Sequence, residues 1–267
     1  MKRTLAFLLI AAMCTTSAQQ KERTNSDEAA IKQAALDYAE GFYEGNADRM
    51  ERAVDPLLIK RGLFISRLTG SCYLNEINSE MLIEITRTGR GKLDPAQRNI
   101  RCEVLDKSDY AASAKIFTAR FNDYLHLVKE NGRWRLVNVL WTNPVPQPTT
   151  SLEKEQGAIR KAIDDFQAAI ESKDADGVAR LIYPGLTLRT FREIVPGGKK
   201  IIQEMNADVI VEAVRSGRTA GQPKASVTVL DVYENMASIK LSTDKGGDYL
   251  HMAKLDGQWK IVNGLTF

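Results

Sequence analysis

The chain contains the same sequence pattern twice. Asp123-Tyr124-Leu125-His126 is followed by Asn131-Gly132-Arg133-Trp134, and Asp248-Tyr249-Leu250-His251 is followed by Asp256-Gly257-Gln258-Trp259. The second pattern lies 125 residues after the first, so that Gly257 corresponds to Gly132. Repeats of solenoid proteins span only about 20 to 50 residues. The sequence therefore predicts two tandem domains that arose by duplication.

Each copy begins with a pattern typical of helices. In the first copy, apolar residues recur at steps of four, three and four, which places them on one helix face: Ile31, Ala35, Tyr38 and Phe42. The second copy repeats the pattern 128 residues later at Ile159, Ile163, Phe166 and Ile170. Short second helices are expected to begin at Asn46 and Asp174, which are good N-caps, and to be stopped by Pro56 and Pro184. A third helix is expected near residues 80–88 and 204–216.

The remainder of each copy has the patterns of β-strands. Apolar residues alternate with polar ones over residues 112–116 and 237–241, which predicts strands with one buried and one exposed face. Asn131-Gly132 and Asp256-Gly257 are strong hairpin signals. On the strand after the first hairpin, we expect Trp134, Leu136, Asn138 and Leu140 to share one face, as Trp259, Ile261, Asn263 and Leu265 do in the second copy. The fold class is therefore α+β.

A proline-rich segment separates the two copies. Residues 143–150 carry proline at every second position, from Pro144 to Pro148, and such a segment is extended and semi-rigid. We expect domain 1 to span residues 25–142 and domain 2 to span residues 151–267.

The first residues have the features of a secretory signal. Lys2 and Arg3 precede an apolar run from Leu5 to Met13, and Thr16-Ser17-Ala18 offers small residues for cleavage. We expect residues 1–18 to be a signal peptide and the protein to be exported, to the periplasm or beyond the cell; lipidation at Cys14 is the alternative. The apolar run is far shorter than the roughly 20 residues of a membrane helix, and we expect no membrane span.

Charge and cysteine usage exclude several classes of partner. The chain has 37 basic and 34 acidic residues, a formal charge of +3, and loss of Lys2 and Arg3 with the signal leaves +1. A near-neutral protein lacks the basic stripe that nucleic acids require, so we expect no nucleic acid. Cys72 and Cys102 could form a disulfide or pack as small apolar residues. No spacing typical of metal ligands occurs, and we expect neither a metal nor a cofactor.

Several segments of the first copy resemble a known family. They are residues 43–53 (Tyr43 to Ala53), Lys60-Arg61-Gly62-Leu63, Leu105-Asp106, Ala112-Ser113-Ala114-Lys115 and Asp123-Tyr124-Leu125-His126-Leu127. Together they resemble the lumazine-binding branch of the nuclear transport factor 2-like superfamily. The resemblance covers nearly all of the first copy, and the second copy is similar but more diverged.

The resemblance implies a cone-shaped domain of the cystatin-like kind, in which a curved antiparallel sheet packs on three helices and leaves a pocket at the wide end. The superfamily holds isomerases, cyclases, dehydratases and non-catalytic binding domains, and fold does not choose among them. This chain departs from the family at one point. Where His-Pro is expected after the second helix, it has Asp55-Pro56 and, in the second copy, Tyr183-Pro184.

Candidate binding residues come from the helix and from the strands of the first copy. Histidine can bind or shuttle a proton near neutral pH, a tyrosine in an apolar pocket can stabilise an oxyanion, arginine can clamp an anion, and a buried amide needs a partner. The candidates are Tyr38, Phe42, Tyr43, Arg61, Tyr124, His126 and Asn138. For each, the alternative is a structural role: helix core for the first three, surface charge for Arg61, and a covered sheet face or a domain contact for the others.

Three functions are compatible with the sequence. The first is an exported, non-catalytic protein that binds a small apolar or aromatic molecule, with the pocket in the first copy. The second is an isomerase, cyclase or dehydratase in which His126 or an acid is the base and Tyr38 or Tyr43 the donor. The third is an interaction module in which the two copies form an internal pseudo-dimer through their Tyr-x-His faces, or the chain forms a homodimer.

Overall fold

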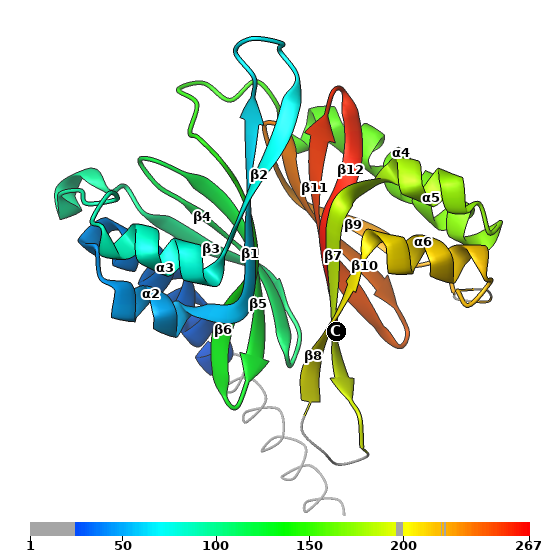
Figure 1. Cartoon of the computed structure of the whole chain (residues 1–267), viewed down its shortest axis with the longest axis horizontal. Coiled ribbons are helices and arrows are strands. Elements are labelled where there is room, and N and C mark those ends of the chain that lie inside the picture. The colour runs from blue at the N-terminus through cyan, green and yellow to red at the C-terminus, as the bar shows by residue number, and fades with distance from the viewer. Residues whose placement is uncertain (1–24, 196–199, 220, 222) are drawn as a thin grey trace, which may run out of the picture.

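The structure is a computed structural model that describes residues 25–195, 200–219, 221 and 223–267. Two domains stand side by side, each with one sheet and a layer of helices (Figure 1). The expected signal peptide, residues 1–18, lies outside the described residues. Among the residues that are described, no helix has the length and apolar character needed to cross a membrane.

Both domains contain three α-helices and six strands in the same order. In domain 1 the helices are residues 25–44, α2 (Ala47–Ala53) and α3 (Ser79–Arg87), with a 3-10 turn η1 (Pro95–Gln97). Its strands are β1 (Val54–Ile65), β2 (Cys72–Asn78), β3 (Arg101–Lys107), β4 (Ala111–Phe117), β5 (Asn122–Glu130) and β6 (Arg133–Thr142). In domain 2 the helices are α4 (Leu152–Glu171), α5 (Ala175–Leu181) and α6 (Ala207–Arg215). Its strands are β7 (Ile182–Glu193), β8 (Lys200–Asn206), β9 (Ser226–Tyr233), β10 (Met236–Thr243), β11 (Gly246–Leu255) and β12 (Gln258–Thr266).

The two sheets have equivalent topologies. Their strand orders are β2-β1-β6-β5-β4-β3 and β8-β7-β12-β11-β10-β9, and the helices cover the outer side of each sheet (Figure 1). Most neighbouring strands are antiparallel, as the sequence indicates, but β1 runs parallel to β6 and β7 runs parallel to β12. The predicted α+β class with two tandem domains is confirmed.

The helix starts follow the predicted caps, but two details differ. Asn46 accepts a hydrogen bond from the Arg49 amide, and Asp174 accepts one from Gly177, as N-caps do. Pro56 and Pro184 do not stop these helices, because α2 ends at Ala53 and α5 at Leu181. Both prolines lie within strands, β1 and β7, next to the irregular register with β6 and β12. Proline is tolerated there because an irregular strand segment leaves its missing amide unneeded. Helix α6 begins at Ala207 rather than near residue 204, because residues 204–206 complete β8.

The hairpin predictions are confirmed, and both turns use positive φ angles. Asn131 and Gly132 have φ of 51° and 78°, and Asp256 and Gly257 have φ of 47° and 83°. Two successive positive φ angles match the right-handed twist of the strands that the turns connect. Neither cysteine forms a disulfide: Cys72 and Cys102 are both free thiols.

Two predictions about strand faces are wrong, one because the domains pack against each other and one because of a β-bulge. β4 was expected to have an exposed face, yet Ser113 is fully buried because the sheet of domain 2 covers it, and Ser238 is buried in the same way. The expected single face of β6 is broken by a bulge. His126 pairs with Asn138 and Leu127 pairs with Leu136, so the strand changes face at the extra residue, Val137.

The consequence of the bulge is visible in the cores. Trp134 and Leu136 lie in the core of domain 1, whereas Leu140 lies in a cluster shared with domain 2. The same change of face occurs between Ile261 and Asn263 in domain 2. Each β-strand that follows a hairpin therefore contributes side chains both to the core of its own domain and to the contact between the domains, and the bulge changes which positions do so.

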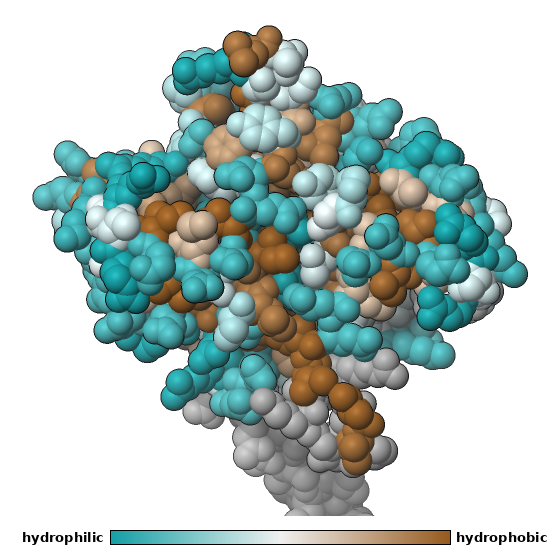
Figure 2. All heavy atoms as spheres, in the orientation of Figure 1, coloured by the Kyte–Doolittle hydropathy of each residue, from teal (hydrophilic) through white to brown (hydrophobic). Residues whose placement is uncertain are grey.

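Apolar side chains are exposed at the ends of the projecting hairpins. Figure 2 shows apolar side chains at the ends of the β1–β2 and β7–β8 hairpins. Exposed apolar residues on these hairpins are Ile65, Leu68, Tyr73, Ile194, Val195 and Ile201. Further exposed apolar side chains lie on the helices, among them Met81, Leu152 and Val209.

Two glycine substitutions in domain 2 test the turn assignment. Added Cβ atoms at Gly257 and at Gly157 would contact nothing within 4 Å, so that only backbone conformation distinguishes them. Gly257→Ala is expected to destabilise domain 2 by about 1 kcal/mol, because alanine is strained at positive φ. Gly157→Ala is expected to stabilise it by about 1 kcal/mol, because Gly157 lies inside α4. Urea unfolding of the full chain measures the free energy of unfolding of both variants. Equal changes of the same sign would contradict the turn geometry.

Candidate functional site

The two histidines meet at the centre of the contact between the sheets. His126 on β5 and His251 on β11 are both fully buried, and their rings stack with centroids 3.6 Å apart and planes inclined by 28°. Each Nδ1 lies 3.1 Å from the side-chain nitrogen of an asparagine on the next strand, Asn138 or Asn263. The expected Tyr-x-His faces of the two copies therefore face each other.

A buried arginine from each domain connects these asparagines to the opposite sheet. Arg189 donates from Nη1 to the Asn138 side-chain oxygen, and Arg61 donates from Nη1 to Asn263. Both arginines are fully buried. Each is also paired with a carboxylate of its own domain, Arg61 with Glu76 at 2.8 Å and Arg189 with Glu204 at 2.6 Å. The guanidinium groups thus bridge the domains and retain a counter-ion.

This network determines the protonation of the histidines. Because the asparagine oxygens accept from arginine, their NH₂ groups must donate to Nδ1, which leaves the imidazole proton on Nε2. Burial lowers the pKa of His126 well below its usual value, with His251 and Arg189 adding repulsion, and burial lowers the pKa of His251 to about 3. Both rings are therefore neutral at pH 7, and both Nε2 atoms lack a hydrogen-bond partner within the described part of the chain.

Matched tyrosines complete the contact on either side. Tyr124 donates to Asp231 at 2.8 Å, and Tyr249 donates to Asp106 at 2.6 Å. Lys115 also pairs with Asp231 at 3.2 Å. At the middle of the contact the hydroxyls of Ser113 and Ser238 lie 2.8 Å apart, and apolar residues from both domains form two shared clusters. The contact therefore has an approximate twofold symmetry.

The cone of domain 1 is filled by aromatic side chains. Phe121 makes edge contacts with Tyr38 and Phe42 at centroid distances of 6.1 and 5.9 Å and stacks on Tyr43 at 5.5 Å. Tyr43 donates to Thr118 at 2.7 Å. The three helix residues predicted to bind a ligand are thus packed into the core around Phe121.

A buried polar cluster lies beside these rings. Lys60 Nζ is 2.8 Å from the carboxylate of Asp123, and the Tyr38 hydroxyl, which accepts from Lys60, donates to the same oxygen of Asp123. Burial lowers the pKa of Lys60 and raises the pKa of Asp123, while their mutual attraction opposes both changes. The ammonium also lies 4.6 Å from the ring centroid of Trp141. Domain 1 therefore holds a buried ion pair inside its cone, beside the aromatic rings.

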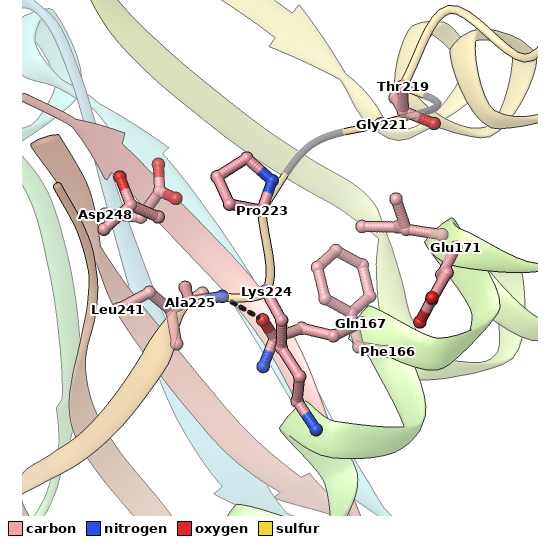
Figure 3. Close-up of a pocket in the computed structure, with 12 residues that line it drawn as sticks. Phe166, Gln167, Glu171, Thr219, Gly221, Pro223, Lys224, Ala225, Leu241 and Asp248 are labelled. Carbon is pink, nitrogen blue, oxygen red and sulfur yellow. Dashed lines mark hydrogen bonds between the residues drawn. The ribbon is translucent and has the colours of Figure 1, made fainter. Parts of the chain in front are cut away.

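Domain 2 has a cavity of about 350 Å³ at the matching place. Its apolar walls come from Phe166 and Ile170 on α4 and Leu241 on β10, and polar groups are supplied by Gln167, Thr243 and Asp248, among others. Figure 3 shows Asp248 on one side of the space and Phe166 and Glu171 on the other, with Pro223 and Ala225 between them. A concave, partly apolar space with a few polar groups is typical of a small-molecule site.

Sequence differences between the copies explain why only this cone is open at that place. The residue that corresponds to Phe121 is Gly246, the one that corresponds to Tyr43 is Glu171, and the one that corresponds to Trp141 is Thr266. Three ring systems are thereby replaced by smaller or more flexible groups. The space that Phe121 fills in domain 1 is consequently left to the cavity in domain 2.

Asp248 is the principal charged group inside the cavity. Burial raises its pKa, whereas the hydrogen bond that the Thr266 hydroxyl donates to Oδ1 at 2.5 Å opposes that shift. Gln167 accepts a hydrogen bond from the Ala225 amide at 2.7 Å (Figure 3). This bond fixes the orientation of the amide, and its buried Nε2 donor has no partner among the residues that the structure describes. The cavity thus presents an acceptor at Asp248 and an amide in its wall.

Comparison with known proteins identifies the family. The family model described as "Putative lumazine-binding" matches residues 26–142 and again residues 154–265. The chain belongs to this lumazine-binding family. The match covers both copies, so the second domain is a family member in spite of its divergence.

Solved structures of nuclear transport factor 2-like proteins resemble single domains of this lumazine-binding family member. A protein of unknown function from Shewanella baltica is 20% identical, with a TM-score of 0.38, and the match covers 45% of this chain and 95% of that one. A ketosteroid isomerase-like protein from Erwinia carotovora atroseptica is 15% identical, with a TM-score of 0.33 and coverage of 46% and 99%. A cystatin-like fold protein from Burkholderia xenovorans is 14% identical, with a TM-score of 0.32 and coverage of 44% and 94%. None of the curated proteins compared with the chain matches it.

The structure divides the predicted site residues into two groups that do not meet in one pocket. Tyr38, Phe42 and Tyr43 lie in the core of domain 1. Arg61, Tyr124, His126 and Asn138 lie between the sheets, where they contact domain 2. Sequence reasoning missed Lys60, Asp123 and Asp248 as site residues. The signal available for the two aspartates was that an Asp begins each Asp-Tyr-Leu-His pattern.

The buried histidines make stability depend on pH. Their folded-state pKa values lie below the usual 6.5, so the unfolded state binds more protons below pH 6.5. The stability that the two histidines contribute is complete above pH 6.5 and is lost as the pH falls toward about 3. For each histidine, the free energy of unfolding decreases by up to about 1.4 kcal/mol per pH unit. The groups facing them are Arg61, Arg189, Tyr124 and Tyr249, and none of these is an acid that would favour the protonated ring.

The double variant His126→Asn/His251→Asn tests this. An asparagine oxygen can replace the Nδ1 acceptor but does not titrate, so the variant is expected to lose less stability than the wild type between pH 6.5 and pH 4. Urea unfolding at several pH values measures the difference. Parallel pH profiles for the two proteins would show that the histidines are not the titrating groups.

Removing the buried lysine of domain 1 is expected to be costly. Lys60→Leu leaves Asp123 buried without its counter-ion, which is expected to destabilise domain 1 by about 3–5 kcal/mol. Lys60→Leu/Asp123→Asn removes both charges and is expected to recover much of this loss. The matched control is Lys161→Leu, whose exposed pair with Asp165 is worth less than about 1 kcal/mol. Thermal unfolding compares them, and equal effects of the two lysine substitutions would contradict the buried pair.

Proposed function

We propose that this protein is exported and binds a small molecule with an apolar or aromatic part, without transforming it, in the cone of domain 2. The observation that carries the proposal is the cavity of about 350 Å³ lined by Phe166, Ile170 and Leu241, with Asp248 on its wall. Export is inferred from the basic, apolar and small-residue segments within residues 1–18.

The size and composition of the cavity support a small ligand. Ligand pockets commonly measure about 300–1,000 Å³ and combine apolar walls with a few polar groups. The present cavity lies at the small end of that range. The family description names lumazine, a planar bicyclic heteroaromatic compound, and lumazine is therefore the reference ligand. Its flat ring would pack on Phe166, and its N–H groups would find an acceptor in Asp248.

The location differs from the one favoured by sequence. The first copy is richer in tyrosine, but its tyrosines surround Phe121 and its polar groups bond to one another. For the alternative enzymatic function, the geometry removes the favoured base from the cone. His126 stacks on His251 between the sheets, and the Tyr38 hydroxyl donates to Asp123. The binding function in domain 2 does not require His126 or the Tyr38 hydroxyl to be available to a ligand.

A second role is favoured for domain 1. The face of its sheet that is turned away from the helices makes matched contacts with domain 2 through Arg61, Tyr124 and His126, and residues of both domains share two apolar clusters. We assign domain 1 the role of an internal partner that covers the sheet of domain 2. The contact between domains 1 and 2 would then replace, within one chain, the homodimer contact that single domains form through their sheets.

Native mass spectrometry of the mature protein from its own host tests the binding function. A small molecule retained at one per chain is expected, and release on denaturation identifies it. Isothermal titration of the emptied protein with lumazine then gives the affinity. An empty chain that also fails to bind lumazine would contradict the proposal as stated.

A variant that fills the cavity locates the site. Ile170→Phe introduces the residue that the first copy has at this position, Phe42, and is expected to reduce ligand affinity about tenfold or more because its ring occupies the space. Leu152→Phe is the matched control, since Leu152 is exposed on the same helix. If both variants bind as the wild type does, the ligand lies elsewhere.

A further inference from the structure

The two domains place an aspartate at the same point of the cone. Asp123 on β5 pairs with Ile116 on β4 and Trp141 on β6. Asp248 on β11 pairs in the same register with Leu241 on β10 and Thr266 on β12. The surroundings of Asp123 therefore indicate which chemical group satisfies a carboxylate at this position.

In domain 1 that group is an ammonium ion supplied by the chain itself. Lys60 reaches from β1 into the cone, and its Nζ lies 2.8 Å from Asp123. The ammonium is surrounded by rings: it lies 5.2 Å from the Tyr38 centroid, 5.4 Å from that of Phe121 and 4.6 Å from that of Trp141. A carboxylate and aromatic faces together are a favourable site for an organic cation.

Domain 2 keeps the carboxylate but has lost the cation. The residue that corresponds to Lys60 is Leu188, and the one that corresponds to Tyr38 is Phe166. Among the residues that the structure describes, Asp248 has one hydrogen-bond partner, the Thr266 hydroxyl at Oδ1, and no ion-pair partner. A half-buried carboxylate beside open space is left without the counter-ion that its counterpart has.

The other charges of the cavity do not supply that counter-ion. Lys224 lies at the wall, but its Nζ pairs with Asp164 at 3.0 Å. Glu171 adds a second carboxylate to the lining. The excess of negative charge attracts a cation and repels an anion of the same shape.

From this comparison we infer that the domain 2 cavity takes an organic cation, an ammonium or amidinium group on an apolar or aromatic body, whose charged nitrogen lies at Asp248. The ligand then makes the contact that Lys60 makes in domain 1, and Phe166 offers its ring to the cation or to the apolar body. This inference rests on the proposed binding function but is narrower, because a neutral ligand would satisfy that function alone.

Three probes of nearly equal size and different charge test the inference. Benzylammonium, benzyl alcohol and benzoate are titrated at pH 7 into the mature full chain, and amide NMR shifts of cavity residues report binding. Benzylammonium is expected to bind about tenfold or more tightly than benzyl alcohol, because a charge-assisted bond replaces a neutral one. Benzoate is expected to bind most weakly.

Two variants assign the preference to Asp248. Asp248→Asn retains an oxygen for the Thr266 hydroxyl and is expected to abolish the difference between benzylammonium and benzyl alcohol. Leu188→Lys places the lysine of domain 1 at the matching position of domain 2 and is expected to prevent benzylammonium binding by occupying the site. Asp165→Asn, at an exposed carboxylate on the same helix as Phe166, is the matched control. It is expected to leave the affinities for benzylammonium and benzyl alcohol unchanged.

The outcomes separate this inference from the broader function. If benzyl alcohol binds at the cavity as tightly as benzylammonium, the inference is overturned and small-molecule binding stands. If none of the three probes shifts the cavity residues, no molecule is retained from the host and lumazine does not bind, both are overturned. Should Asp248→Asn fail to fold, unchanged benzylammonium binding by folded Leu188→Lys would still overturn the inference.

Discussion

Two buried arginines bridge the sheets of this protein, and the orientation of the asparagines and the protonation of the histidines between the sheets depend on them. Arg61 and Arg189 each donate to an asparagine of the opposite domain and keep a carboxylate of their own. A buried guanidinium without such partners would be strongly destabilising. The arginines therefore require the asparagines to present their oxygens, and the asparagines in turn require neutral histidines.

This arrangement decides where a ligand can bind. A sheet face that carries conspicuous residues such as tyrosine and histidine would ordinarily be a candidate surface for recognition. Here the two faces cover each other, so that Tyr124 and Tyr249 bond to aspartates across the contact. Room for a small molecule is left on the other side of the sheet, between the strands and the helices, where the two copies differ.

The extent to which sequence predicts this molecule follows from the range of the interactions involved. Caps and hairpins depend on neighbouring residues, and Asn46, Asp174, Asn131-Gly132 and Asp256-Gly257 were correctly assigned for that reason. The burial of Ser113 depends on a residue 125 positions away, Ser238, and no local pattern reveals it. The bulge at Val137 cannot be recognised from a local pattern either. An added residue in a strand changes the face on which every later side chain of that strand lies, but it leaves the composition unchanged.

The site itself was hidden by the duplication that made the fold easy to recognise. Residues that recur in both copies attract notice, yet recurrence here marks the contact that both domains share, as for His126 and His251. The cavity arises where the copies differ, at Phe121 against Gly246 and at Lys60 against Leu188. Losing ring contacts is expected to weaken the core of domain 2, which also buries apolar side chains in the clusters shared with domain 1. A duplicated protein can in this way use one copy as a filled, stabilising partner and leave the other open for a ligand.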